Sequence, residues 1–130
     1  MNWIFNDDCP IYLQIMEIIK KEIAVGNLAE GDKMPPVREM ALEARVNPNT
    51  MQKAMAELER EGLLCSKRTS GRFVAGSKEE GETLKANLSE KYMSEFTENM
   101  KNIGYSPESI LEKYKEYIDN PELFTEQYLN

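Results

Sequence analysis

The chain has 130 residues and a formal net charge of −7, with 41% hydrophobic and 30% charged residues. This balance excludes a disordered chain, and the length fits one compact domain with a short appended element. The sequence contains no histidine, and neither a phosphate-binding loop nor a nucleophile motif is present. We therefore expect no enzymatic activity, no metal site and no cofactor.

The sequence also bears on the compartment. No apolar run approaches the roughly 20 residues of a membrane-spanning helix, and the opening residues MNWIFNDDCP lack the features of a signal peptide. We expect a cytoplasmic protein with no membrane partner. In a reducing compartment Cys9 and Cys65 are expected to remain free, as small buried side chains.

The charge is distributed unevenly along the chain. Residues 10–76 hold ten Lys or Arg against nine Asp or Glu, whereas residues 77–130 hold six Lys against twelve Asp or Glu. An acidic protein can still carry a local basic face on one module. Small and charged residues interrupt the apolar pattern near Gly76, so we predict one domain over residues 1–76 and a second over residues 77–130.

Apolar residues recur at helical spacing in three segments of the first domain, residues 10–25, 36–44 and 48–60. Asn47 is a good N-cap for the third helix, and Pro48 suits its first position. The second and third helices are joined by about four residues, which is typical of a helix-turn-helix. The expected inward-facing residues are Ile11, Ile15, Ile18, Ile19 and Ile23, then Val37, Met40, Ala41 and Ala44, then Met51, Ala54, Met55 and Leu58.

Two short β-prone runs follow, residues 63–66 and 72–75, separated by a polar turn over residues 67–71. They predict a small hairpin with three cations. The fold class is therefore mainly α with a small β-hairpin wing, a winged helix-turn-helix followed by a helical tail. At the N-terminus, Trp3 and Phe5 alternate with polar residues and are expected to lie extended along the core.

The tail carries a single apolar stripe on a long helix, with a second helix beginning at Pro107 and a short turn after Pro121. This helix pair has more apolar surface than it can cover alone, so we expect a homodimer. The dimerisation residues would be Leu84, Leu88, Tyr92, Phe96, Met100, Ile103, Ile110, Leu111 and Tyr114. A small-molecule pocket lined by the aromatic residues Tyr92, Phe96, Tyr105, Tyr114 and Tyr117 is the alternative.

Residues 10–75 resemble the DNA-binding domain of GntR-type bacterial transcription regulators. The segments PIYLQI, GNLAEGDKMP, VRE, VNPNT, ELEREG and GRFV occur in the family's order and spacing. The short helical tail resembles the YtrA-like subfamily, whose members are small dimeric repressors often linked to transporter operons.

The resemblance implies a set of DNA-contacting residues in the second helix, the third helix and the wing. They are Arg38, Asn47, Asn49, Thr50, Gln52, Lys53, Arg68, Thr69, Gly71 and Arg72. Three departures from the family pattern stand out. Pro36 replaces a capping serine, Thr69 replaces a wing glycine, and Gln52 and Lys53 stand where relatives often have arginines, so the base preference cannot be copied.

The function implied is a dimeric, sequence-specific repressor that binds double-stranded DNA at an inverted-repeat operator. A small-molecule effector bound between the C-terminal helices stays open as a further partner. The alternative is a protein-protein adaptor that works through its winged domain and acidic tail. Steep salt dependence of DNA binding distinguishes the first function from the second.

Overall fold

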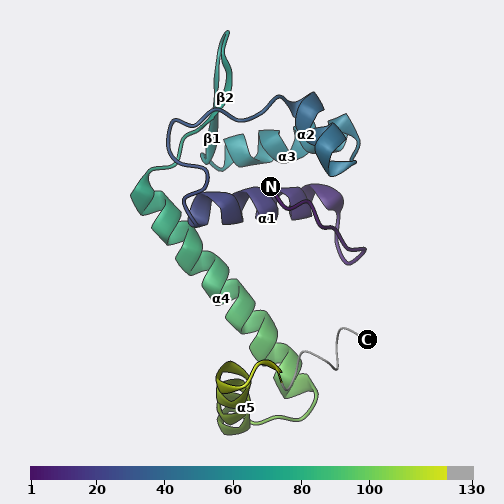
Figure 1. Ribbon diagram of the computed structural model, residues 1–130, viewed down its shortest axis with the longest axis vertical. Coiled ribbons are helices and arrows are strands. Elements are labelled where there is room, and N and C mark those ends of the chain that lie inside the picture. The colour runs from purple at the N-terminus through teal and green to yellow at the C-terminus, as the bar shows by residue number, and fades with distance from the viewer. Residues whose placement is uncertain (123–130) are drawn as a thin grey trace. The chain divides into compact units, whose positions relative to one another are not determined.

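The computed structural model describes residues 1–122 and contains five helices and two strands (Figure 1). The elements are α1 (Ile11–Ala24), α2 (Val37–Ala44), α3 (Pro48–Arg60), β1 (Leu64–Lys67), β2 (Gly71–Val74), α4 (Lys78–Asn102) and α5 (Pro107–Asp119). The chain forms two compact units, Met1–Asn87 and the part from Leu88 onward. Most of the short turn predicted after Pro121 lies outside the described residues.

The core of the first unit is built mainly by α1 and α3, as the apolar spacing predicts. Fully buried side chains are contributed by Ile15, Ile19, Met51, Ala54, Met55 and Leu58. From α2, Met40, Ala41 and Ala44 complete the core. Ile11, Ile18 and Val37 are only half-buried, because they lie at the margins of the apolar stripes.

The connection between α2 and α3 is short because both helix ends are closed locally. Helix α2 ends at Ala44 and is capped by Arg45, which has a positive φ of 59°, and α3 begins after Asn47. The Asn47 side chain accepts a hydrogen bond from the Asn49 amide at 2.7 Å, so the predicted cap is confirmed. Pro36 precedes α2 and supplies no side-chain cap, as expected from its missing acceptor.

The wing is an antiparallel hairpin in which Leu64 pairs with Val74 and Ser66 with Arg72. Both strands are displaced by one residue from the predicted runs, because Gly71 adopts a positive φ of 98° and the chain reverses over three residues. The loop before α2 lies along the other edge of β2, where the Met34 amide donates a hydrogen bond to the Arg72 carbonyl at 2.9 Å. The wing is therefore held along β2 from both sides.

The N-terminal segment packs on this unit. Trp3 and Phe5 are partly buried against the core with their rings stacked at 6.5 Å, which confirms the expectation. Gln14 is buried and holds the segment, because its Nε2 donates to the carbonyls of Asn6 at 2.9 Å and Cys9 at 2.8 Å. The prediction of two buried cysteines is wrong: Cys9 is exposed and Cys65 is half-buried, both free.

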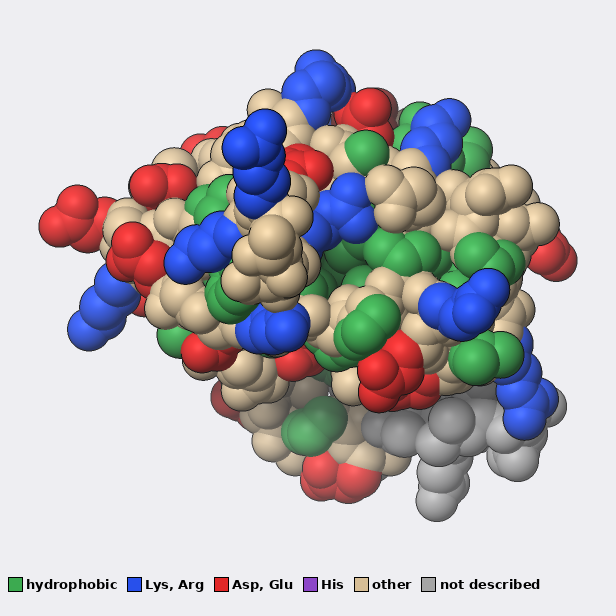
Figure 2. Space-filling model, turned by 90° about the horizontal axis from the view of Figure 1, so that it is seen from above, with side chains coloured by type: hydrophobic (Ala, Val, Ile, Leu, Met, Phe, Trp, Pro, Cys, Tyr) green, Lys and Arg blue, Asp and Glu red, His purple; other side chains and the backbone are tan. Residues whose placement is uncertain are grey.

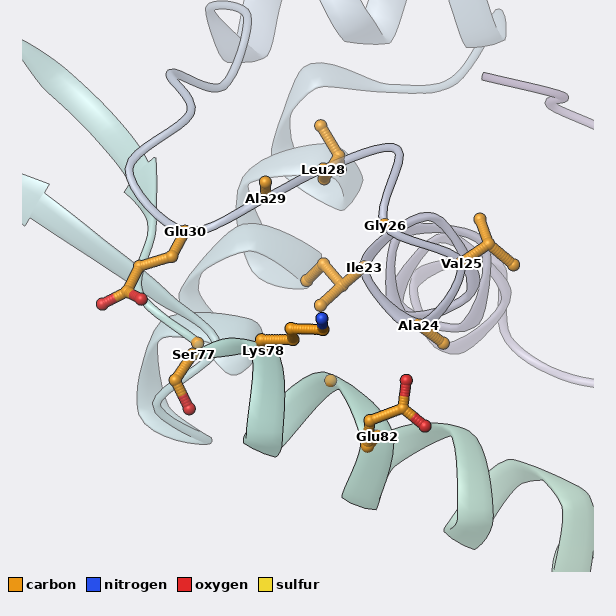
Figure 3. Close-up of a pocket in the computed structure, with 12 residues that line it drawn as sticks. Ile23, Ala24, Val25, Gly26, Leu28, Ala29, Glu30, Ser77, Lys78 and Glu82 are labelled. Carbon is orange, nitrogen blue, oxygen red and sulfur yellow. The ribbon is translucent and has the colours of Figure 1, made fainter.

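The first turns of α4 belong to the winged unit. Gly81 is buried, and a Cβ built on it would lie 3.6 Å from the Ile23 carbonyl oxygen, so α4 approaches the end of α1 closely there. A hollow of about 450 Å³ lies beside this contact, with Lys78 and Glu82 facing the end of α1 (Figure 3). The compact unit consequently runs to Asn87, beyond the boundary near residue 76 that composition indicates.

Candidate nucleic-acid interface

Helix α3 presents a polar face opposite its buried one. Asn49, Gln52 and Lys53 are exposed, and Thr50 is half-buried beside them. Residues three and four apart share a helix face, so Asn49, Gln52 and Lys53 form one surface at the start of α3. This face is suited to read base edges in a major groove, which admits an α-helix.

The charge on α3 is graded along its length. Its first turn has no acidic residue, whereas Glu57 and Glu59 lie in the second half. Arg60 donates hydrogen bonds to Glu57 from Nε at 3.0 Å and Nη2 at 2.6 Å, and this bonding lowers the pKa of Glu57. Glu57 therefore stays ionised and would repel a DNA phosphate. The first half of α3 contains no acidic residue, so this is the part of the helix that can approach the phosphate backbone.

Arg38 lies in the first turn of α2, where its side chain is exposed. Among the described residues it forms no ion pair, neither with Glu39 nor with Glu43, so its five N–H donors are available to an external anion.

Lys53 is oriented by a residue that the sequence reasoning did not select. Its Nζ lies 4.0 Å from the centre of the Tyr12 ring, a cation–π contact between α3 and α1. The contact stabilises one position of a long flexible side chain. Nothing in the sequence singles out this pair, because its two members are far apart in the chain.

The wing brings three further cations, Lys67, Arg68 and Arg72, to the same unit. Arg68 and Thr69 lie exposed in its turn, shortly before Gly71. A groove of about 480 Å³ runs between the wing and the loop before α2, lined by cations from both: Lys33, Lys67, Arg68 and Arg72. Lys33 lies close to the wing, since its Cε is 3.5 Å from a Cβ built on Gly71. Figure 2 shows Lys and Arg side chains spread over the wing end of the molecule, with acidic side chains among them.

Arg72 differs from the other predicted contacts because its guanidinium is held inside the unit. Its Nη1 donates to Oε1 of Gln52 at 3.2 Å, and its Nε lies 3.5 Å from Oε2 of Glu59. Only 18% of the Arg72 side chain is exposed. The structure therefore joins wing and α3 through Arg72.

Substitutions separate the capping role of Asn47 from the DNA contact that the family resemblance predicts for it. We expect Asn47→Ala to lower the free energy of unfolding by about 1 kcal/mol, because the cap of α3 is lost. Asn47→Asp keeps the capping acceptor but adds a negative charge, so stability is retained while DNA affinity falls. Urea denaturation and fluorescence anisotropy measure the two effects. If Asn47→Asp binds DNA with the wild-type affinity, Asn47 acts only as the cap of α3.

The second unit carries an apolar groove formed by α4 and α5. Ile110 is buried, and the Phe96 and Tyr114 rings lie 5.7 Å apart. The groove measures about 600 Å³ and also includes Tyr92 and Leu111, of which Leu111 is 71% exposed. Most of the residues predicted for dimerisation thus leave apolar surface uncovered within one chain. Leu84 differs, because it packs against the core of the first unit.

Neither unit offers a metal site or a membrane span among the described residues. No group of three or more Cys, Asp or Glu side chains is placed to hold a metal ion in residues 1–122. In the same range, no helix combines the length and apolarity needed to cross a bilayer.

Three helices, a helix-turn-helix connection and a basic wing define a winged helix-turn-helix DNA-binding protein. Residues 11–74 match the family described as bacterial regulatory proteins, gntR family. The chain belongs to this GntR family, whose members are transcription regulators and not enzymes.

Two relatives from Bacillus subtilis extend the match along the chain. The uncharacterized HTH-type transcriptional regulator YhcF is 38% identical over 115 residues, covering 88% of this chain and 95% of YhcF. The HTH-type transcriptional repressor YtrA is 37% identical over 112 residues, covering 84% of this chain and 82% of YtrA. The alignments therefore include the helical tail as well as the winged domain.

Solved structures are similar too. A GntR family transcriptional regulator from Listeria monocytogenes has a TM-score of 0.78 and 35% identity, covering 86% of this chain and 98% of that chain. The DNA-binding domain of AraR in complex with operator ORE1 has a TM-score of 0.50 and 30% identity, covering 58% of this chain and 94% of that chain. The fold and the DNA-binding class are thus shared with known regulators.

Proposed function

We propose that this GntR-family regulator is a homodimeric repressor that binds an inverted-repeat operator. The observation that carries the proposal is the exposed, acid-free first half of α3, with cations of α2 and the wing on the same unit. The repressor YtrA, similar over most of both chains, supports repression as the outcome. Occupying a promoter would exclude RNA polymerase.

The proposal assigns the contacts by chemistry. Asn49, Gln52 and Asn47 face base edges, because amides bond to bases in the major groove. Thr50 and Lys53 bind phosphate oxygens, as do the exposed cations outside α3. Arg38 contributes from α2, and Arg68, Thr69 and Gly71 from the wing.

The helical tail would be the part of the chain through which two copies associate. Residues 77–130 would pair through the apolar groove of α4 and α5, where Tyr92, Leu111 and Tyr114 are exposed in a single chain. A two-fold axis then places the two recognition helices on half-sites about 34 to 36 Å apart. An effector that binds in this groove is the competing use of the same surface.

The proposal includes a compartment and a target. A regulator of bacterial genes acts in the cytoplasm, where the DNA lies. Only the resemblance to the YtrA-like subfamily supports a transporter operon as the regulated genes.

Removing the Arg38 side chain tests the DNA interface. We expect Arg38→Ala to weaken operator binding about 10-fold to 100-fold, because a charge-assisted hydrogen bond contributes about 1.5–3 kcal/mol. The slope of log affinity against log salt should become shallower by about one per contact. Fluorescence anisotropy across a salt series gives both quantities.

Lys85→Ala is the matched control, since Lys85 is also exposed but lies on α4. Its affinity and salt slope should equal those of the wild type. If Arg38→Ala and Lys53→Ala both bind like the wild type while circular dichroism shows intact folds, the assignment of the interface is wrong. If the wild type binds no DNA at low salt, the adaptor function is favoured.

A further inference from the structure

Four side chains connect the wing to α3, the helix that we propose reads the bases. Gln52 and Glu59 lie seven residues apart on α3, which places them on one face two turns apart. Ser66 and Arg72 are directly paired across the hairpin. Arg72 contacts both α3 residues, and the Ser66 hydroxyl donates a hydrogen bond to Oε1 of Glu59.

The contact determines which end of the Gln52 amide is free. Oε1 of Gln52 accepts the hydrogen bond from Arg72 Nη1 at 3.2 Å, so the amide nitrogen with its two N–H donors is directed away from the guanidinium. Gln52 itself is exposed. A glutamine that pairs bidentately with adenine must instead offer both its oxygen and its nitrogen to the base.

We propose that Arg72 is a positioning residue for base recognition: it holds the Gln52 amide so that only N–H donors face the DNA, which favours guanine over adenine. This inference rests on the proposed function, since it concerns the base that α3 reads. Guanine presents two acceptors in the major groove, N7 and O6. Adenine presents one acceptor beside an amino donor, and cytosine presents an amino donor, so both suit a donor-only amide less well.

Arg72 is restrained enough to fill this role. Its backbone carbonyl accepts from the Met34 amide at 2.9 Å, and its strand is paired with β1, so the Cα is fixed. Glu59 lies 3.5 Å from its Nε and is itself bonded to the wing through Ser66. The guanidinium is therefore restrained by its strand, by the Glu59 carboxylate and by its burial, with 18% of the side chain exposed, whereas Gln52 is exposed.

The experiment is a selection from a randomised duplex library with the full-length protein, followed by affinity measurements on duplexes that differ at one base pair. Gln52→Ala identifies the position at which wild-type preference disappears. At that position we expect the wild type to bind guanine about tenfold better than adenine. In Arg72→Met, which keeps the aliphatic stem without a donor, we expect this ratio to fall to one or below.

Two further variants separate positioning from general effects. Arg72→Lys retains a donor for Oε1 of Gln52 and should keep the guanine preference. Arg68→Ala removes an exposed wing cation and should weaken binding to all duplexes alike. The ratio of the affinities for guanine and adenine should stay unchanged. A folded Arg72→Met that retains the wild-type ratio would overturn the inference, and so would an unfolded one, because Arg72 would then be structural. A wild type that enriches no sequence would instead contradict the proposed function.

Discussion

Leu58→Ala is expected to lower the free energy of unfolding of the winged unit by about 2–5 kcal/mol, because it leaves a cavity in a fully packed core. The Leu58 side chain has 0% exposure, and its carbonyl accepts from the Leu63 amide at the end of α3. Domains of this kind are stable by only about 5–15 kcal/mol. Urea denaturation followed by circular dichroism measures the loss.

Leu42 supplies the control for this substitution. It is also a helical leucine of the winged unit, but its side chain is 76% exposed. Leu42→Ala should therefore change the unfolding free energy by less than about 0.5 kcal/mol. Equal effects of the two substitutions would contradict the packing of α3 described above.

Leu111→Asp is expected to convert the proposed dimer to monomers and to reduce operator affinity by at least about 100-fold. The 71% exposure of Leu111 in the single chain means that the substitution leaves each chain folded. In the proposed dimer the aspartate would be buried in an apolar interface, where an uncompensated charge costs several kcal/mol. Analytical ultracentrifugation gives the mass, and anisotropy gives the affinity.

Glu112→Gln is the adjacent control, since Glu112 is exposed on the same helix and lies outside the groove. It should retain the dimer and the wild-type affinity. A Leu111→Asp protein that remains dimeric would contradict the use of this groove for pairing. A wild type that is already monomeric at micromolar concentration would contradict the dimer itself.

The sequence was most informative where structure is determined locally. The buried face of α3 and the Asn47 cap follow from helical spacing and from the chemistry of one side chain, so both were predicted correctly. The strands of the wing were displaced by one residue, because β propensity does not show where the chain reverses. Gly71 sets that point through its backbone conformation.

Contacts between distant residues could not be predicted. Lys53 and Tyr12, and Arg72 and Gln52, meet only after the helices and wing have packed. Gln14 holds the N-terminal segment from a helix position that periodicity alone treats as one more polar residue. Composition indicates a change of character near Gly76, and the close approach of Gly81 to α1 is a contact that composition does not show. The family resemblance selected the DNA-contacting residues, but it contained no information on how Arg72 is restrained.

The central claim is that a dimer of this chain reads a specific operator. Its most direct test is a fluorescence-anisotropy titration against duplex DNA from upstream of the protein's own gene, beside a scrambled duplex, at low and at physiological salt. We predict saturable binding to the upstream duplex alone, with two chains per duplex and affinity that falls steeply with salt. Absence of binding to either duplex at low salt would contradict the claim.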